Sequence, residues 1–97
     1  MWLGSKKMLI LQILTDDCGW MTGRELIEAS DGELWAGNVY VHLCVLRKDL
    51  GYIRRRERQR ENAPPCFEYQ IIGMGRRALN RRRRWRKWYN IFLPELA

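Results

Sequence analysis

The stretch NVYVHLCVLRKDLG, residues 38–51, decides the fold. Wound as an α-helix at about 3.6 residues per turn, it aligns four apolar side chains on one face. These residues are Val39, Leu43, Leu46 and Leu50. Gly51 follows directly and suits the left-handed residue that ends many helices. We therefore predict a helix from about Leu34 or Asn38 to Leu50 that buries one apolar stripe.

The opposite side of this helix is also partly apolar. It carries Gly37, Val41, Cys44, Val45 and Lys48, with Asn38 and His42 on one flank and Tyr40 and Arg47 on the other. Val41 and Val45 do not belong to the core stripe. They either pack against another subunit or element, or contact thymine methyl groups in the major groove of DNA. We favour the DNA contact, because apolar side chains are suitable readers of the thymine methyl.

Two shorter helices are predicted upstream. Residues 8–14 are dense in apolar side chains, and Ser5 can cap the helix that contains them. Thr22 and Glu25 have the spacing of a capping box. The second helix that they begin would bury Leu26, Ile27 and Ala29. A Ser-Asp-Gly turn at residues 30–32 then leads into the third helix, which is the helix-turn-helix arrangement.

After Gly51 the spacing of apolar residues changes from helical to strand-like. YIRRRER (52–58) and CFEYQII (66–72) read as strands, and two prolines in the connecting QRENAPP prevent a continuous ladder. In the second strand, alternation places Phe67, Tyr69 and Ile71 on one face, and Cys66, Glu68, Gln70 and Ile72 on the other. The first arm carries Arg54, Arg55, Arg56, Arg58 and Arg60. A hairpin directly behind a helix-turn-helix is a wing. The predicted fold is therefore an α+β winged helix-turn-helix, with a three-helix core, a two-stranded wing and a long C-terminal helix.

The long C-terminal helix begins near Gly73 and is ended by Pro94. One face is aromatic and the remainder is almost wholly arginine and lysine. The aromatic residues that we expect at a dimer interface are Trp85, Trp88, Tyr89 and Phe92. We divide the chain into a winged helix-turn-helix DNA-binding domain, residues 1–72, and a basic helical dimerisation element, residues 73–97. The aromatic face could instead cover the first helix or stack on nucleobases.

Charge is distributed unevenly along the 97 residues. The net charge is +7, yet residues 1–50 hold five basic and seven acidic residues, and residues 51–97 hold thirteen basic and four acidic ones. A positive field confined to one half of the chain is the distribution expected of a protein that binds a polyanion.

Several other classes of protein are disfavoured. Three widely spaced cysteines predict neither a disulfide framework nor a zinc site, and they indicate the reducing cytoplasm. No apolar run approaches the roughly 20 residues of a membrane span, so we predict no membrane partner. One histidine, no phosphate-binding glycine loop and no Ser-His-acid set predict a protein that is not an enzyme. We expect no catalytic residues, no metal and no cofactor.

Two family resemblances follow from these motifs. VYVHLCVLRKDLG resembles the recognition helix of the winged-helix effector domains of OmpR-type response regulators, and GWMTGRELIEA is similar to their second helix. This likeness covers residues 9–53 without a gap. Further along, EYQIIGMGRRAL is similar to the end of PadR-type winged-helix repressors, where a strand leads through glycine into a C-terminal dimerisation helix.

The OmpR-type resemblance implies roles for individual residues. Val41 would contact thymine methyl groups, and His42 and Arg47 would reach phosphates. Cys44 and Val45 stand where OmpR-type helices often place arginines that contact bases, so this helix can make few bidentate contacts to guanine.

We therefore predict a cytoplasmic, sequence-selective binder of double-stranded DNA, a small transcriptional repressor that acts as a homodimer. The predicted DNA-binding residues are Thr22, Arg24, Asn38, Val41, His42, Val45, Arg47 and Lys48, together with Arg54, Arg55, Arg56, Arg58 and Arg60 of the wing. Two alternatives stay open. One is RNA binding through NRRRRWRKW (80–88), and the other is a protein-interaction module, such as a host-factor inhibitor, that addresses an acidic partner.

Overall fold

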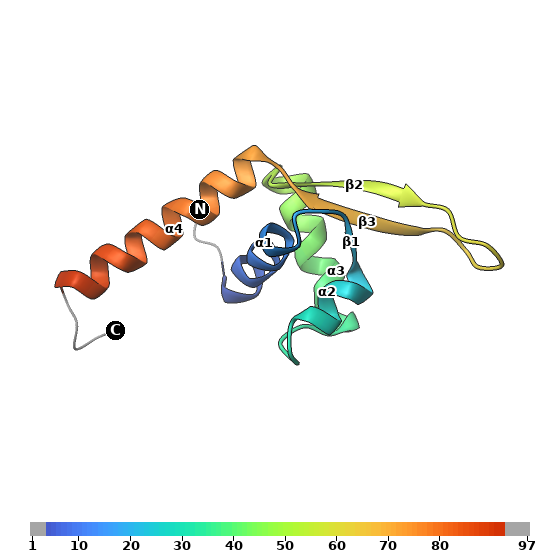
Figure 1. Cartoon of the computed structure of the whole chain (residues 1–97), viewed down its shortest axis with the longest axis horizontal. Coiled ribbons are helices and arrows are strands. Elements are labelled where there is room, and N and C mark those ends of the chain that lie inside the picture. The colour runs from blue at the N-terminus through green and yellow to red at the C-terminus, as the bar shows by residue number, and fades with distance from the viewer. Residues whose placement is uncertain (1–3, 93–97) are drawn as a thin grey trace.

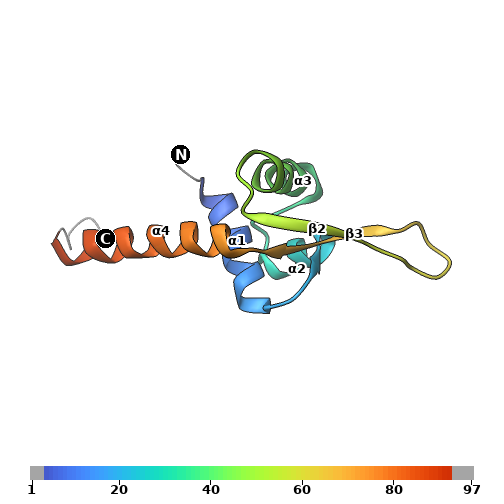
Figure 2. The same cartoon turned by 90° about the horizontal axis from the view of Figure 1, so that it is seen from above.

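The computed structural model describes the backbone of residues 4–92 and the side chains of residues 4–83. Within that range the chain forms four α-helices and a three-stranded sheet (Figure 1). The order is α1 (Ser5–Asp17), β1 (Met21–Thr22), α2 (Gly23–Ala29), α3 (Ala36–Cys44), the π-helical turn η1 (Val45–Asp49), β2 (Ile53–Arg58), β3 (Cys66–Ile71) and α4 (Gly73–Phe92). The β2–β3 hairpin and α4 project to opposite ends of a molecule about 55 Å long (Figure 2). The predicted α+β winged helix-turn-helix fold is confirmed.

The sheet has one strand more than the two predicted for the wing. Its order is β1-β3-β2, and all pairs are antiparallel. Met21 pairs with Tyr69 and Thr22 with Glu68, so these two residues form an edge strand beside β3. Two residues are too few to show a period in the sequence, which is why β1 was missed. The extra strand carries the Met21 side chain into the core.

A single hydrophobic core joins the helices to one face of the sheet. Its largest fully buried side chains are Ile10, Leu11, Leu14, Leu26, Val39, Leu43, Leu46 and Ile71. Burying each such side chain stabilises the fold by roughly 1.5–3 kcal/mol before entropy is counted. The predicted stripe of α3 is confirmed at Val39, Leu43 and Leu46, while Leu50 is partly buried at its edge. Ala78 and Leu79 attach the start of α4 to this same core.

Of the two helix caps predicted in the first half of the chain, the structure confirms one and contradicts the other. The capping box is present, because Glu25 N donates to Thr22 Oγ1 and Thr22 N donates to Glu25 Oε1, both at 3.1 Å. The prediction that Ser5 caps α1 is wrong. Gly4 holds the cap position with an extended backbone, and Ser5 is already helical. Ala29 was expected to be buried but is exposed, since the short α2 ends there against solvent.

The third helix does not remain an α-helix to Leu50. Its last turn is a π-helix, in which Leu50 N donates to Val45 O at 3.1 Å. Tyr52 N donates to Leu46 O at 2.9 Å, and Gly51 takes the expected left-handed conformation at φ 66°. The wider turn accommodates one extra residue. Leu46 thereby stays in the core while the chain turns into β2 and buries Ile53.

Candidate nucleic-acid interface

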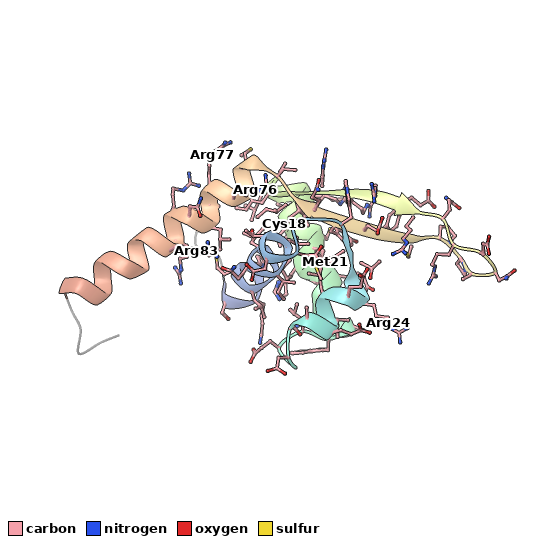
Figure 3. All side chains as sticks on the ribbon, viewed as in Figure 1. Cys18, Met21, Arg24, Arg76, Arg77 and Arg83 are labelled. Carbon is pink, nitrogen blue, oxygen red and sulfur yellow. The ribbon has the colours of Figure 1, made fainter. Side chains whose placement is uncertain are left out.

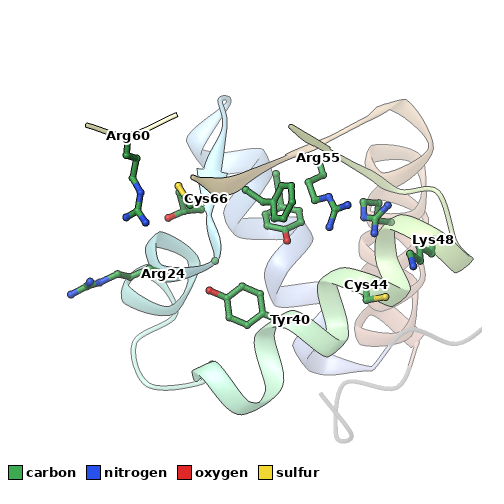
Figure 4. Close-up of a pocket in the computed structure, with 12 residues that line it drawn as sticks. Arg24, Tyr40, Cys44, Lys48, Arg55, Arg60 and Cys66 are labelled. Atoms are coloured by element: carbon green, nitrogen blue, oxygen red, sulfur yellow. The ribbon is translucent and has the colours of Figure 1, made fainter. Parts of the chain in front are cut away.

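An open groove of about 650 Å³ lies between the start of α2, the exposed side of α3 and η1, and the wing (Figure 4). Its lining residues are Thr22, Gly23, Arg24, Tyr40, Cys44, Arg47, Lys48, Arg55, Arg60, Cys66, Phe67 and Tyr69. Five of these carry a positive charge, and none is Asp or Glu. We call this surface the basic groove. Figure 4 shows Arg55 and Arg60 entering it from the wing, and Arg24 and Lys48 bordering it from the helices.

Two tyrosines form part of the groove wall. A Cβ added to Gly23 would lie 2.6 Å from Tyr40 Cε1, so the absence of a side chain at the first residue of α2 lets this ring pack closely. Tyr69 is buried, and burial raises the pKa of its phenol, although the positive charge of Arg55 acts against this shift. Tyr69 is therefore protonated at neutral pH and can donate a hydrogen bond.

The wing presents Arg55 to the groove on an aromatic support. The guanidinium carbon of Arg55 lies 4.0 Å from the centroid of the Phe67 ring, a cation–π distance. Phe67 shares a sheet face with Tyr69 but lies beyond the core, which leaves it exposed. At the tip, Arg60 donates to Pro64 O through Nε at 2.8 Å and through Nη2 at 2.6 Å.

The other predicted wing arginines, Arg54, Arg56 and Arg58, alternate with Arg55 and do not line the groove. We call these three the outer arginine row. Arg56 Nε donates to Glu68 Oε1 at 3.0 Å, and Arg58 Nη1 donates to Glu68 Oε2 at 3.4 Å. The Glu68 side chain is only 8% exposed, so its negative charge opposes two of the three positive charges at close range.

An aromatic ring and an amide complete the contacts of this outer face. The guanidinium carbons of Arg54 and Arg56 lie 5.0 and 4.2 Å from the centroid of the Trp20 ring. Arg54 also donates to Gln70 Oε1 through Nε at 2.9 Å and through Nη2 at 2.6 Å. The guanidinium groups of the outer arginine row are therefore already bound by Glu68, Gln70 and Trp20.

The exposed face of α3 adjoins the basic groove. Val41 is 63% exposed and Cys44 is also exposed, whereas Val45 is partly buried. Neither valine lines the groove itself, but Tyr40, Cys44, Arg47 and Lys48 of the same helical segment do. The structure thus places apolar and cationic side chains next to one another along α3 and η1.

Asn38 and His42, which the sequence predicted as DNA contacts, lie outside the groove lining. Asn38 Oδ1 accepts a hydrogen bond from Trp35 N at 2.9 Å, which stabilises the start of α3. His42 Nδ1 lies 3.1 Å from Lys7 Nζ of α1. Burial, then Lys7 and Lys6, lower the pKa of His42, so its ring is neutral at pH 7.

Sequence reasoning missed several residues that shape these surfaces. Among them are Trp20, Gly23, Tyr40, Phe67, Glu68 and Tyr69. The period-two pattern had correctly separated Phe67 and Tyr69 from Glu68, but it did not show which face borders the groove. The predicted dimer residues Trp85, Trp88, Tyr89 and Phe92 have side chains outside the described residues.

Comparisons with known proteins support the fold. No family model matches the chain, and no curated protein matches its sequence. Among the solved structures that resemble it are two that it matches over nearly its whole length. A PadR-like transcription factor from Bacteroides fragilis has a TM-score of 0.79 at 17% identity, with 94% of this chain and 88% of that chain covered. A proposed transcriptional regulator from Thermoplasma acidophilum has a TM-score of 0.72 at 19% identity, with 92% and 89% covered.

At these identities the likeness shows the fold alone, a winged helix that this chain shares with the two solved proteins. The resemblance of residues 9–53 to OmpR-type domains rests on sequence alone. None of the helices in the described part of the chain is both long and apolar enough to cross a membrane.

Proposed function

We propose that this protein is a transcription regulator that binds double-stranded DNA through the basic groove and the exposed face of α3. The observation that carries the proposal is a groove beside the second helix of a helix-turn-helix that is lined by five cations and no carboxylate. Neutralising phosphates and releasing their counterions supplies most of the non-specific affinity of such proteins for DNA. The shared fold of a transcription factor and a proposed regulator supports the same function.

In this proposal α3 enters the major groove. Val41 contacts thymine methyl groups, with Val45 beside it at the edge of the contact. Arg47 and Lys48 reach phosphates from the far end of the helix, and Thr22 and Arg24 reach them from the start of α2. Because α3 offers few side chains that can make bidentate hydrogen bonds to bases, sequence specificity depends on methyl contacts and on DNA shape.

In this proposal the arginines of the wing have two different roles. We assign phosphate contacts to Arg55 and Arg60, whose side chains border the basic groove. The outer arginine row has a smaller role, since Glu68 already binds Arg56 and Arg58. A contact of that row with DNA would require its guanidinium groups to leave Glu68 and Trp20.

The homodimer and the repressor role belong to the same proposal. The resemblance of the wing and C-terminal helix to PadR-type repressors supports pairing of two copies through α4. Two-fold symmetry then favours a palindromic site whose half-sites are about 34–36 Å apart. A regulator of this kind acts in the cytoplasm.

The test compares two pairs of charge-removing substitutions, one pair in the basic groove and the other in the outer arginine row of the wing. Lys48→Gln with Arg55→Gln removes two charges from the basic groove. Arg54→Gln with Arg58→Gln removes two charges from the outer arginine row and serves as the matched control. Both variants and the wild type are titrated with duplexes selected from a random pool, at several salt concentrations, after circular dichroism has shown that they fold.

The groove variant should lose about tenfold or more in affinity, and the salt slope should fall by about 1.8, or about 0.9 for each lost phosphate contact. The control should stay within about threefold of wild type. Equal losses in both variants would mean that the basic groove is not the DNA site. A protein that selects no sequence, and whose Val41→Asp variant binds like wild type, would favour RNA or an acidic protein partner.

A further inference from the structure

Helix α4 contains more basic residues than any other helix or strand of the chain. Eight of the 18 Lys and Arg residues lie between Gly73 and Phe92, and this segment contains no Asp or Glu. Among its described side chains, four arginines are exposed, namely Arg76, Arg77, Arg81 and Arg83. Gly75, Ala78 and Leu79 occupy the buried side. The part of the helix with described side chains, residues 73–83, therefore turns Ala78 and Leu79 toward the core and these four arginines toward solvent.

These arginines differ from the outer arginine row in their partners. Arg76, Arg77 and Arg81 make no ion pair or hydrogen bond to another side chain of residues 4–83, while Arg83 donates to Gln12 Oε1 of α1. Like charges four residues apart, such as Arg77 and Arg81, repel each other on a helix. The described part of the chain places no carboxylate against them to relieve this repulsion.

The spacing of these charges suits a row of phosphates. At about 1.5 Å per residue, Arg77 and Arg81 are separated by about 6 Å along the helix axis, and Arg76 and Arg83 by about 10 Å. Guanidinium groups on long side chains can adjust to the intervals of a nucleic-acid backbone. A membrane surface fits less well, because an interfacial helix needs its apolar side free, and here Ala78 and Leu79 are buried in the core.

The α4 surface is separate from the basic groove. None of the α4 residues with described side chains, 73–83, lines the groove. Helix α4 leaves the base of the sheet and runs away from the wing (Figures 1 and 2). Figure 3 shows Arg76, Arg77 and Arg83 along this helix, far from Arg24 at the groove. A duplex held in the groove therefore leaves these arginines available.

We propose that Arg76, Arg77 and Arg81, with Arg83 at the edge, form a second site that binds the phosphate backbone of double-stranded DNA without regard to sequence. One protein then holds a selected site in the basic groove and a second duplex segment on α4, and so bridges two segments of DNA. The bridging rests on the proposed function, whereas phosphate binding by α4 does not.

The experiment uses the full chain and two labelled duplexes. A selected duplex is fixed to beads and loaded with protein, and capture of a second, unrelated duplex is measured. The test variant is Arg77→Gln with Arg81→Gln, and the matched control is Arg77→Lys with Arg81→Lys, which keeps the charge at the same exposed positions. Equal loading of the first duplex is verified for each protein.

Wild type and the lysine control should capture the second duplex, and the glutamine variant should lose about fivefold or more of the capture. The salt slope of binding to random duplex should also fall by about 1.8 in the glutamine variant. Undiminished capture by the glutamine variant would overturn the proposal, since bridging would then come from paired grooves alone. A folded RNA hairpin that displaces the second duplex at lower concentration than duplex competitor would overturn the choice of DNA.

The two proposals fail in distinguishable ways. If the groove variant Lys48→Gln with Arg55→Gln loses the selected duplex but keeps salt-sensitive binding to random duplex, α4 is a phosphate site in its own right. If wild type selects no sequence, the regulator proposal fails, and the slope comparison between the glutamine and lysine variants still decides the role of α4.

Discussion

Gly23 and Tyr40 show how a single missing side chain can set the shape of the basic groove. Gly23→Ala would place a methyl group 2.6 Å from Tyr40 Cε1. Tyr40 is 51% exposed and can swing toward solvent, so we expect a small change in melting temperature. The displaced ring alters the groove wall, and affinity for the selected duplex should fall about threefold to tenfold, or roughly 0.7–1.4 kcal/mol. Fluorescence anisotropy and thermal denaturation measure the two effects.

A double-mutant cycle isolates this contact. In a Tyr40→Ala background, adding Gly23→Ala should cost nothing further, because the ring that the methyl group displaces is already gone. If Gly23→Ala weakens binding equally in both backgrounds, its effect comes from the backbone of α2 and the Tyr40 contact is irrelevant.

Glu68 is the residue on which the outer face of the wing depends. Its nearly buried carboxylate accepts hydrogen bonds from Arg56 and Arg58. Glu68→Gln removes the charge while keeping the size, and half-exposed arginines can turn to water, so we expect a loss of about 1–2 kcal/mol in unfolding free energy. Urea denaturation measures it. The exposed Glu57→Gln is the matched control and should change stability by less than about 0.5 kcal/mol.

At the scale of elements, the contact between α1 and α3 gives the protein a pH dependence. Burial and the charges of Lys7 and Lys6 lower the pKa of His42 in the folded state below its usual value of 6.5. Lys6 is also paired with Glu33, whose pKa this lysine lowers, so the negative charge of Glu33 partly offsets the effect of Lys6 on the ring. The unfolded chain therefore binds a proton to His42 more readily than the folded protein does.

The contribution of His42 to the free energy of unfolding should consequently be constant above about pH 7. It should decrease as the pH drops through 6.5 toward the lowered pKa of the folded state. We expect His42→Gln to flatten that fall between about pH 7 and pH 5 in urea denaturation. Gln keeps a polar side chain beside Lys7 without titrating. An identical pH profile in the variant would show that other groups cause the acid destabilisation.

The wing shows what periodicity can and cannot predict. Alternation in CFEYQII correctly placed Tyr69 and Ile71 on one face and Glu68 on the other. It did not show that Trp20 would cover the outer face, since Trp20 is about 35 residues away in the sequence and adjoins a strand too short to have a period. The π-helical turn was missed for a similar reason, because its cause is the exit of the chain into the sheet.

At the scale of the whole molecule, the described positive side chains of residues 51–83 separate into three surfaces. The basic groove and α4 present their cations to solvent, whereas the outer arginine row is partly neutralised by Glu68. The sequence predicted the excess of charge and the polyanion that it suits, but the division depends on which strand face meets the helices. Net charge therefore overstates how many arginines of the wing are available to DNA.

The pairing of two copies through α4 leads to a prediction about spacing. The core includes Ala78 and Leu79 but no described buried residue beyond them, so a chain ending at residue 83 should fold and keep the basic groove. We expect the full chain to be a dimer and to bind two half-sites about one helical turn apart. Inserting about five base pairs, half a helical turn, rotates one half-site to the opposite side of the duplex and should reduce affinity about 100-fold or more.

The truncated chain should be a monomer, bind each half-site weakly and be indifferent to the insertion. Light scattering gives the mass of each protein, and titration of duplexes with and without the insertion gives the spacing dependence. Folding of the truncated chain is verified by thermal denaturation, so that loss of binding is not mistaken for loss of pairing. A truncated chain that still distinguishes the two spacings would place the dimer contact outside residues 84–97, and the first helix would then be the element to examine.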